Sequence, residues 1–102
     1  MIIPEEKIEI PEEKITNYLL VQKAKNDKSA FLFKLGYSME KIKELTEDIK
    51  YIATHNEAVL QQQTQFGEMY EVKGKLKNSA VVTIWLLRVD TDKFRFITLF
   101  PE

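Results

Sequence analysis

The sequence predicts an α+β fold in which two to three N-terminal helices pack on a four-stranded antiparallel meander sheet. Residues 11–54 space their apolar residues at the period of a helix, whereas residues 57–101 alternate at the period of a strand. Between residues 80 and 101, two apolar runs rich in β-branched and aromatic residues flank a short polar segment, which is a β-hairpin signal. Helices that are segregated from strands in this way are typical of α+β domains.

The N-terminal half is expected to hold an extended arm followed by helices. Residues 1–10 end in isoleucines that alternate with charged residues, which predicts an edge strand or an arm. Pro11 stands where a helix can begin, because the first turn of a helix does not need the missing N–H. We expect one helix from there to about residue 22 and a second helix over residues 28–35, which Gly36 would end in the left-handed conformation.

A third helix is expected to start after Ser38, which can cap its first turn, and to end near residues 54–56. Its apolar residues follow each other mostly at intervals of three and four, so they form one stripe that faces the core. These residues are Ile42, Leu45, Ile49, Ile52 and Ala53. Lysines and glutamates fill the other side of the helix, as on a face that is in contact with water.

The C-terminal half predicts four strands joined by short turns. A weak strand with three glutamines covers residues 58–64, and Phe66-Gly67 marks a turn. The next strand alternates apolar residues with lysines up to the turn at Asn78-Ser79. The last two strands carry apolar residues on both faces, so they are expected to lie centrally in a sheet that is covered at least in part on both sides.

The composition excludes several classes of protein. The 102 residues correspond to one domain, and the absence of cysteine excludes disulfides, cysteine zinc sites and thiol catalysis. No apolar run is long enough to span a membrane and the N-terminus lacks the pattern of a signal peptide, so we expect a cytoplasmic protein. The net charge of −1, from 15 basic and 16 acidic residues, gives no overall attraction to nucleic acid. No cofactor or metal motif is present, and we predict that neither is bound.

Three lysines at alternate positions, Lys73, Lys75 and Lys77, share one face of the predicted strand. Their ammonium groups would lie about 7 Å apart and would be able to follow a phosphate backbone. Alternatively, they form a solvated face or protect an edge strand against aggregation, which is a common use of lysine. Lys28 belongs to a basic loop cluster that offers a further phosphate contact or is simply solvated.

Three further residues are candidates for a catalytic site. His55 is the single histidine, the residue type whose ordinary pKa lies near neutrality, and it stands at a helix end, where the helix dipole suits a general acid. Otherwise it is an ordinary helix-terminal residue. Arg95 shares a face with Ile97 and Leu99 if its strand alternates regularly, and would bind a phosphate or form a structural ion pair. Thr98 then lies on the opposite face, as a core threonine or as a hydroxyl that faces a site, together with Phe94, Phe96 and Phe100.

Several segments together resemble a family of small bacterial domains of unknown function. These domains occur as stand-alone proteins and as the C-terminal parts of large polymorphic toxins. The resemblance covers residues 10–101, and residues 95–101 are similar to the family's Arg-Leu-Val-Thr-Ala-Tyr-Pro ending. The other matching segments are residues 14–20, 28–32, 35–37, 66–76 and 82–85.

The chain departs from the pattern of this family at two basic positions. The family usually has Gly-Arg before the lysine that Lys28 matches, whereas this chain has Asn26-Asp27. The Pro-x-Gly-Arg loop that often joins the family's second and third strands is reduced here to Lys77-Asn78-Ser79. If those arginines bind substrate in relatives, this chain binds it differently or not at all.

The order of helices and strands also resembles the barnase- and RelE-like ribonuclease toxins, an analogy at the level of the fold. It implies a toxin module that cleaves RNA without a metal and is held in check by a small antitoxin or immunity protein. In such a site His55 would act as acid or base, Arg95 and Lys73 would stabilise charge on the phosphate, and Thr98 would position it.

The alternative is a non-catalytic module for protein interaction or homo-oligomerisation. The neutral net charge, the single histidine and the missing family arginines favour it, and the turn at Phe66 with the lysine-fringed strand would form its contact surface. The two hypotheses predict different placements of three residues. If Arg95, His55 and Lys73 converge in one cleft, the enzyme is supported. If they are dispersed over separate faces, the binding module is supported.

Overall fold

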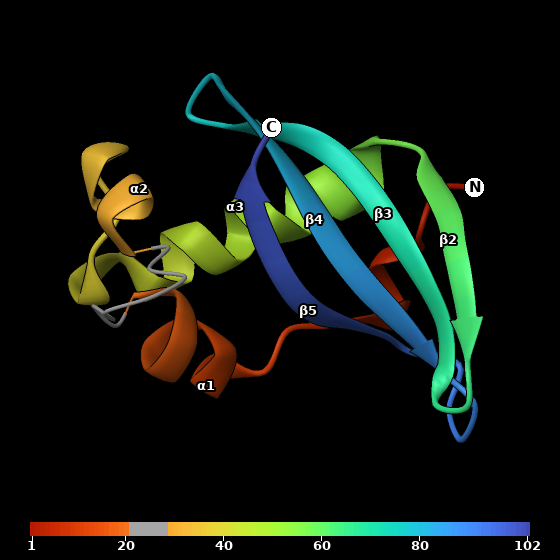
Figure 1. The fold of residues 1–102 in the computed structure, drawn as a ribbon. Coiled ribbons are helices and arrows are strands. Elements are labelled where there is room, and N and C mark those ends of the chain that lie inside the picture. The colour runs from red at the N-terminus through yellow and green to blue at the C-terminus, as the bar shows by residue number, and fades with distance from the viewer. Residues whose placement is uncertain (21–28) are drawn as a thin grey trace.

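The computed structural model describes residues 1–20 and 29–102, apart from the side chain of Tyr18. Its centre is a five-stranded sheet with the strand order β1-β5-β4-β3-β2 (Figure 1). The strands are β1 (Ile8–Glu9), β2 (Ala58–Thr64), β3 (Gly67–Leu76), β4 (Ser79–Arg88) and β5 (Phe94–Pro101).

The predicted α+β class is confirmed, but the prediction of a four-stranded, purely antiparallel sheet is wrong. Strands β2 to β5 form the expected antiparallel meander. The fifth strand, β1, pairs in parallel with β5 through Ile8 opposite Phe94 and Glu9 opposite Arg95. The sequence predicted either an arm or an edge strand for this segment, and the structure shows an edge strand. After the helices and the meander, the chain returns to this segment as β5.

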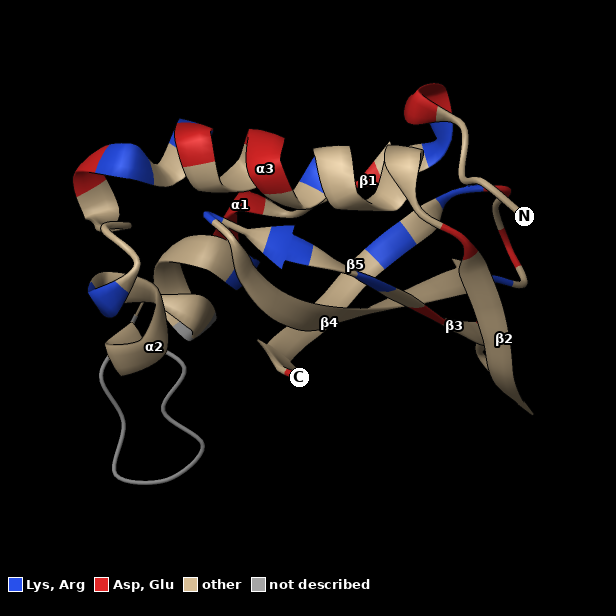
Figure 2. Cartoon of the chain, turned by 90° about the horizontal axis from the view of Figure 1, so that it is seen from above, with Lys and Arg blue, Asp and Glu red and all other residues tan. Residues whose placement is uncertain are grey.

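The helices lie on one face of the sheet and beside its β5 edge. The long helix α3 (Ile42–His55) runs along one side of the sheet, as Figure 2 shows. The shorter helical segments α1 (Glu12–Lys14) and α2 (Ser29–Lys34) lie beyond the edge formed by β5 (Figure 1). Among the described residues, no helix is both long and apolar enough to cross a membrane.

The first two helices differ in detail from the prediction. After α1 the chain continues as the π-helical segment η2 (Ile15–Leu19), which keeps Ile15 and Leu19 in the core although the turn is wider. Its predicted end near residue 22 and the predicted start of the second helix at Lys28 lie outside the described residues. Gly36 ends α2 as expected, with a φ of 98°.

The third helix begins later than the sequence indicates. Ser38 precedes the short 3-10 segment η3 (Met39–Lys41), and its side chain makes no capping hydrogen bond. A further 3-10 segment, η1 (Glu5–Lys7), precedes β1. The α-helical geometry of α3 starts at Ile42 and ends at His55, within the predicted range. Four of its five predicted core residues are buried, namely Leu45, Ile49, Ile52 and Ala53.

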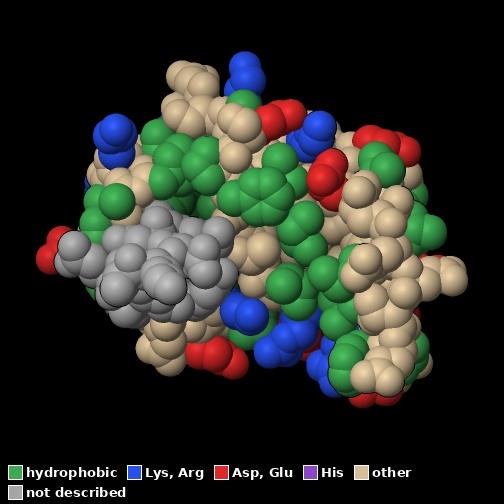
Figure 3. Space-filling model, in the orientation of Figure 1, with side chains coloured by type: hydrophobic (Ala, Val, Ile, Leu, Met, Phe, Trp, Pro, Cys, Tyr) green, Lys and Arg blue, Asp and Glu red, His purple; other side chains and the backbone are tan. Residues whose placement is uncertain are grey.

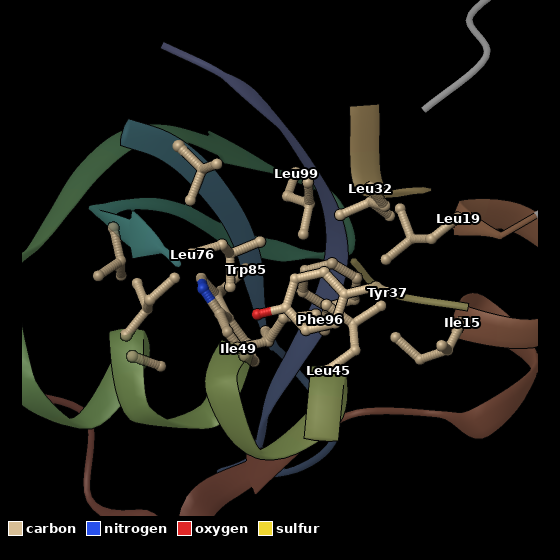
Figure 4. Close-up of a cluster of buried hydrophobic side chains, with 14 of the residues drawn as sticks. Ile15, Leu19, Leu32, Tyr37, Leu45, Ile49, Leu76, Trp85, Phe96 and Leu99 are labelled. Atoms are coloured by element: carbon tan, nitrogen blue, oxygen red, sulfur yellow. The ribbon is translucent and has the colours of Figure 1, made fainter. Parts of the chain in front are cut away.

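The core lies between α3 and the face of the sheet that this helix covers, which we call the inner face (Figure 4). Trp85 and Phe96 are fully buried there, and their rings contact edge to face with centroids 5.4 Å apart. The helix approaches β3 closely at Gly74, where an added Cβ would lie 2.7 Å from the Cγ2 atom of Ile52. A side chain at this position would therefore push α3 away from the sheet, which explains the glycine.

The two faces of the sheet follow from the strand register, because directly opposed residues point to the same face. Thr83 opposite Leu99 and Trp85 opposite Phe96 lie on the inner face. Between these two pairs β5 has a bulge, since Ile84 pairs with Thr98 and the neighbouring Trp85 already pairs with Phe96.

This bulge overturns the predicted faces of β5. Leu99 is buried on the inner face instead of sharing a face with Arg95. Thr98 and Phe100 are opposite Ile84 and Val82 and so lie on the same face as Arg95, which is opposite Leu86. The prediction assumed an unbroken alternation, and Ile97 is the extra residue that breaks it.

Candidate functional site

The face of the sheet that points away from α3, which we call the outer face, is largely apolar. No described helix lies over its central strands, β3 and β4 (Figure 1, Figure 2). Figure 3 shows hydrophobic side chains across the middle of this face, with charged side chains above and below them. The apolar side chains of the outer face are Val59, Met69, Ala80, Val82, Ile84, Leu86, Ile97 and Phe100.

Most of these side chains remain accessible to solvent. Val82 is buried and Phe100 is 38% exposed, while Ile84 and Leu86 are half-buried in the central strand β4. A sheet that faces water normally alternates apolar and polar residues, with the polar ones outward. The expectation that both faces are covered is thus met by the described residues on the inner face only, and the outer face is left as a candidate binding surface.

The outer face also carries four of the predicted site residues. Lys73 is opposite Val82 and Lys75 is opposite Ala80, so both lysines point to the side on which Arg95 and Thr98 lie. Strand spacings of about 4.8 Å and rises of about 3.3 Å per residue place the Cα atoms of Lys73 and Arg95 about 16 Å apart. To contact one phosphate group, both side chains would have to extend toward each other along the face.

Two of the three cations of this set, Lys73 and Arg95, are held by carboxylates at opposite ends of the face. Lys73 Nζ lies 3.2 Å from Glu102 Oε2, and Arg95 Nη1 lies 3.2 Å from Glu9 Oε1. The structural ion pair that the sequence offered as one role of Arg95 is therefore present. Lys73 and Lys75 also line a cavity of about 430 Å³ at the edge of β3, together with Tyr51 and Asn56 from the end of α3.

Lys77 lies away from the other two lysines, in the turn between β3 and β4. Its ammonium group bonds to the carboxylate of Glu44 on α3 and sits 5.2 Å from the ring centre of Tyr37. The hydrogen bond from Lys77 lowers the pKa of Glu44, and the same contact raises the pKa of Lys77. Lys77 thus ties the turn to the helix, whereas Lys28 lies outside the described residues.

His55 is the last residue of α3 and is exposed to solvent. The His55 ring stacks on the ring of Tyr51 with centroids 3.8 Å apart, and the Nδ1 atom of His55 lies 3.0 Å from the carbonyl oxygen of Tyr51. The helix belongs to the layer that covers the inner face, whereas Arg95 points from the outer face. The structure therefore does not bring His55 and Arg95 into one site.

A pocket that the sequence did not predict opens at the Arg95 end of the outer face. Its volume is about 520 Å³, and we call it the arginine pocket after Arg88 and Arg95. The backbone N–H of Val89 donates to the carbonyl of Phe66 at 3.1 Å, which joins the β2–β3 turn to the end of β4. The remaining lining residues are Gln65, Leu86, Asp90 and Ile97.

The predicted contact residue Phe66 belongs to this pocket, but Arg88 and Asp90 were missed. Arg88 Nη2 lies 3.0 Å from Asp90 Oδ2, so the two charges at the end of β4 partly neutralise each other. In the sequence, Arg88 stands next to a polar hairpin segment. This position alone does not show that the β2–β3 turn lies against Arg88. In the described ranges, 1–20 and 29–102, no three histidine, aspartate or glutamate side chains gather as a metal site would need.

The comparisons with known proteins give a family and no function. A family described as a domain of unknown function, DUF6883, matches residues 3–102 of the chain. No curated protein and no solved structure matches the chain.

Proposed function

We propose that this chain, which belongs to the DUF6883 family of domains of unknown function, is a non-catalytic module that holds a protein partner on its outer face. The observation that carries the proposal is the apolar stripe along β4, half-exposed and without a described helix over it. Surfaces of this kind mark interaction sites in soluble proteins, because apolar area in contact with water is costly.

The charges around the stripe indicate the chemistry of the partner. Arg88 and Arg95 each make one ion pair through a single nitrogen, although a guanidinium carries five N–H donors. The arginine pocket therefore has unused donors for a carboxylate, next to the apolar side chains of Leu86 and Ile97. We infer that the partner offers an apolar segment with an acidic residue at one end.

The placement of the predicted catalytic residues supports binding more than catalysis. A metal-independent ribonuclease needs an acid or base within hydrogen-bond reach of the phosphate that its cations stabilise. His55 lies in the helix layer, and Lys73 and Arg95 lie at opposite ends of the outer face, each with its own carboxylate.

The ribonuclease toxin is the second candidate, supported by the shared face of Lys73, Lys75, Arg95 and Thr98. It is tested by induced expression in a bacterial culture with total RNA examined on a gel. Growth arrest with fragmented RNA, abolished by Arg95→Ala or His55→Ala in a protein that still folds, would establish this candidate. Intact RNA and normal growth would leave the binding module as the better description.

The binding module is tested by titrating the purified domain with the purified product of the neighbouring gene in a calorimeter. The variants Ile84→Thr and Leu86→Thr place a β-branched side chain, which strands favour, at each position but remove apolar contact area from the outer face. We expect each to weaken binding by about tenfold or more, as for a contact worth about 1.4 kcal/mol.

The matched control for these variants is Phe33→Ala, which removes an exposed apolar side chain from α2 and should bind like the wild type. Arg88→Ala tests the acidic end of the partner and should weaken binding most at low salt. If both threonine variants bind as tightly as the wild type while circular dichroism shows intact folds, the outer face is not the binding surface.

A further inference from the structure

We propose that β2 pairs with β2 of a second copy of this chain, so that two five-stranded sheets join across a two-fold axis. β2 is the last strand at one side of the sheet (Figure 1). Among the residues that the structure describes, residues 59–64 have a strand neighbour only on the β3 side. The open edge of a strand presents N–H and C=O groups that accept a further strand.

The backbone of Ala58 shows which groups of β2 point to this open edge. Its N–H donates to the carbonyl of Met1 at 2.7 Å, and its own carbonyl accepts from the amino group of Met1 at 3.4 Å. Both groups of Ala58 therefore point away from β3, and because the direction alternates along a strand, those of Leu60 do as well. One extended residue thus already adds to this edge at Ala58, and Leu60 offers the same geometry before the bulge at Gln61.

At the opposite side of the sheet, the helical segments α1 and α2 lie beside β5, beyond the two residues that β1 pairs with (Figure 1). At the far side, β1 has only two residues, of which Glu9 is charged. The end of β3 extends beyond β2 and carries Lys73 and Lys75, which is the protective use of lysine that the sequence suggested. Residues 58–65 contain neither a charged residue nor a proline, and a bulge at Gln61 is their single irregularity.

The chemistry of β2 fits a second copy of itself. Antiparallel pairing about a two-fold axis uses the same strand twice and closes, so it gives a dimer and not a fibre. No like charges meet along this strand, and the glutamine amides of residues 61–63 both donate and accept hydrogen bonds, so they can pair with identical side chains.

Exposed apolar side chains at the two ends of the strand complete the contact. Val59 and Leu60 are 50% and 46% exposed near its start, and Phe66 is 64% exposed just beyond its end. Antiparallel pairing with the axis near Gln61 places Val59 and Leu60 opposite residues 62–64 of the second copy, so these two side chains are covered in part by the partner strand. Because β2 has seven residues, the interface is small and the dimer is expected to be weak and dependent on concentration.

The experiment is sedimentation equilibrium of the untagged protein over a range of concentrations. For the wild type we expect the mass to rise from 12.0 kDa toward twice that value as the concentration increases. Gln61→Lys places like charges near the two-fold axis, because Gln61 is the middle residue of β2. Leu60→Pro removes an outward N–H without removing a hydrogen bond to β3. Both variants should stay at the monomer mass.

The matched control is Met39→Lys, which adds the same charge at an exposed residue of η3, outside β2, and should dimerise like the wild type. Circular dichroism separates a lost dimer from a lost fold, and the lysine variant serves if the proline variant unfolds. A wild type that stays monomeric at millimolar concentration would overturn the proposal. So would a dimer that survives both β2 variants, or one that is abolished by Ile84→Thr on the outer face, since the interface would then lie elsewhere.

Discussion

Thr83 is a single buried hydroxyl that joins two strands and the largest core side chain. Its Oγ1 atom donates to the carbonyl of Val72 at 2.8 Å and accepts from Nε1 of Trp85 at 2.8 Å. In Thr83→Val the shape is kept but the indole N–H loses its partner inside the core. We expect a loss of about 1–3 kcal/mol in the free energy of unfolding, measured by urea denaturation followed by tryptophan fluorescence.

Thr83→Ser is the control, because it keeps the hydroxyl and removes only a methyl group. It should cost less than the valine variant if the two hydrogen bonds account for the effect. Equal losses for the two variants would mean that packing of the methyl group, and not the hydrogen bonds, determines the stability at this position.

Because of Tyr37, the free energy of unfolding is expected to change with pH in the alkaline range. Burial raises the pKa of its hydroxyl, as does the hydrogen bond that it donates to the carboxylate of Asp48. The folded-state pKa lies above the value of about 10 in the unfolded chain, so the stabilisation is complete below pH 10 and is lost as the pH rises above it. The free energy of unfolding should fall by up to about 1.4 kcal/mol per pH unit from this group.

Urea denaturation between pH 8 and pH 11 for the wild type and for Tyr37→Phe measures this loss. Other groups titrate in both proteins alike, so the difference between the two curves isolates Tyr37. The wild type should lose more stability than the phenylalanine variant above pH 10. Parallel curves would contradict a raised pKa at this site.

At the scale of single residues, the sequence indicated residue types better than positions. It identified Arg95 as an ion-pair or phosphate residue, and the structure places it against Glu9. It did not foresee that Thr98 joins Arg95 on one face, because an extra residue in a strand leaves no mark in the composition. It missed Arg88, because the arginine pocket forms where the β2–β3 turn meets the end of β4, and such contacts between distant turns depend on strand register.

Among the elements, the β3–β4 turn shows how local backbone geometry restricts the sequence. Lys77 and Asn78 have φ angles of 48° and 71°, and Leu76 pairs with Ser79, so this is a two-residue hairpin turn with both central residues left-handed. We expect Asn78→Gly to be neutral or stabilising and Asn78→Val to lose about 1–2 kcal/mol, because a β-branched residue is strained at positive φ. Urea denaturation of the two variants measures the difference, and equal stabilities would contradict this account.

The elements themselves were predicted better than their ends. The strand over residues 58–64 coincides with β2, and the apolar stripe over residues 42–53 lies in α3. The start of α3 was placed too early, because Ser38 is a preferred capping residue but precedes a 3-10 turn here. Hydrogen bonds at a helix end depend on neighbouring elements, which periodicity does not report.

For the molecule as a whole, the N-terminal residues pack against a core formed mostly by residues much later in the sequence. Ile3 is fully buried in the main hydrophobic cluster, whereas the adjacent Ile2 is 49% exposed. Ile3→Ala should therefore lower the free energy of unfolding by about 2–5 kcal/mol, as for other buried isoleucines cut to alanine. Ile2→Ala, its matched control, should change it by no more than about 0.5 kcal/mol. Similar effects of the two substitutions in thermal unfolding would show that this segment does not seal the core.

The overall architecture was predictable only up to contacts between distant segments. The segregation of helices and strands gave the α+β class, but the parallel pairing of β1 with β5 joins residues 86 positions apart, as in Glu9 and Arg95. Such a pairing needs no local turn signal, so nothing in residues 1–10 reveals it. That no described helix covers the outer face was hidden for a similar reason, because apolar residues on both sides of a strand do not tell whether something covers each side.

The extra residue in β5 has a consequence for how this chain tolerates change over generations. In a strand, inside and outside are assigned by odd and even positions, and Ile97 switches that parity once between Phe96 and Thr98. Deleting Ile97 would make Phe96 and Thr98 neighbours, so the pairs Trp85–Phe96, Ile84–Thr98 and Thr83–Leu99 would remain and each later side chain would keep its face. Inserting a further residue there would instead turn Leu99 to water or make the strand slip against β4. Lineages of this domain are therefore expected to tolerate the loss of one residue in this segment better than the gain of one.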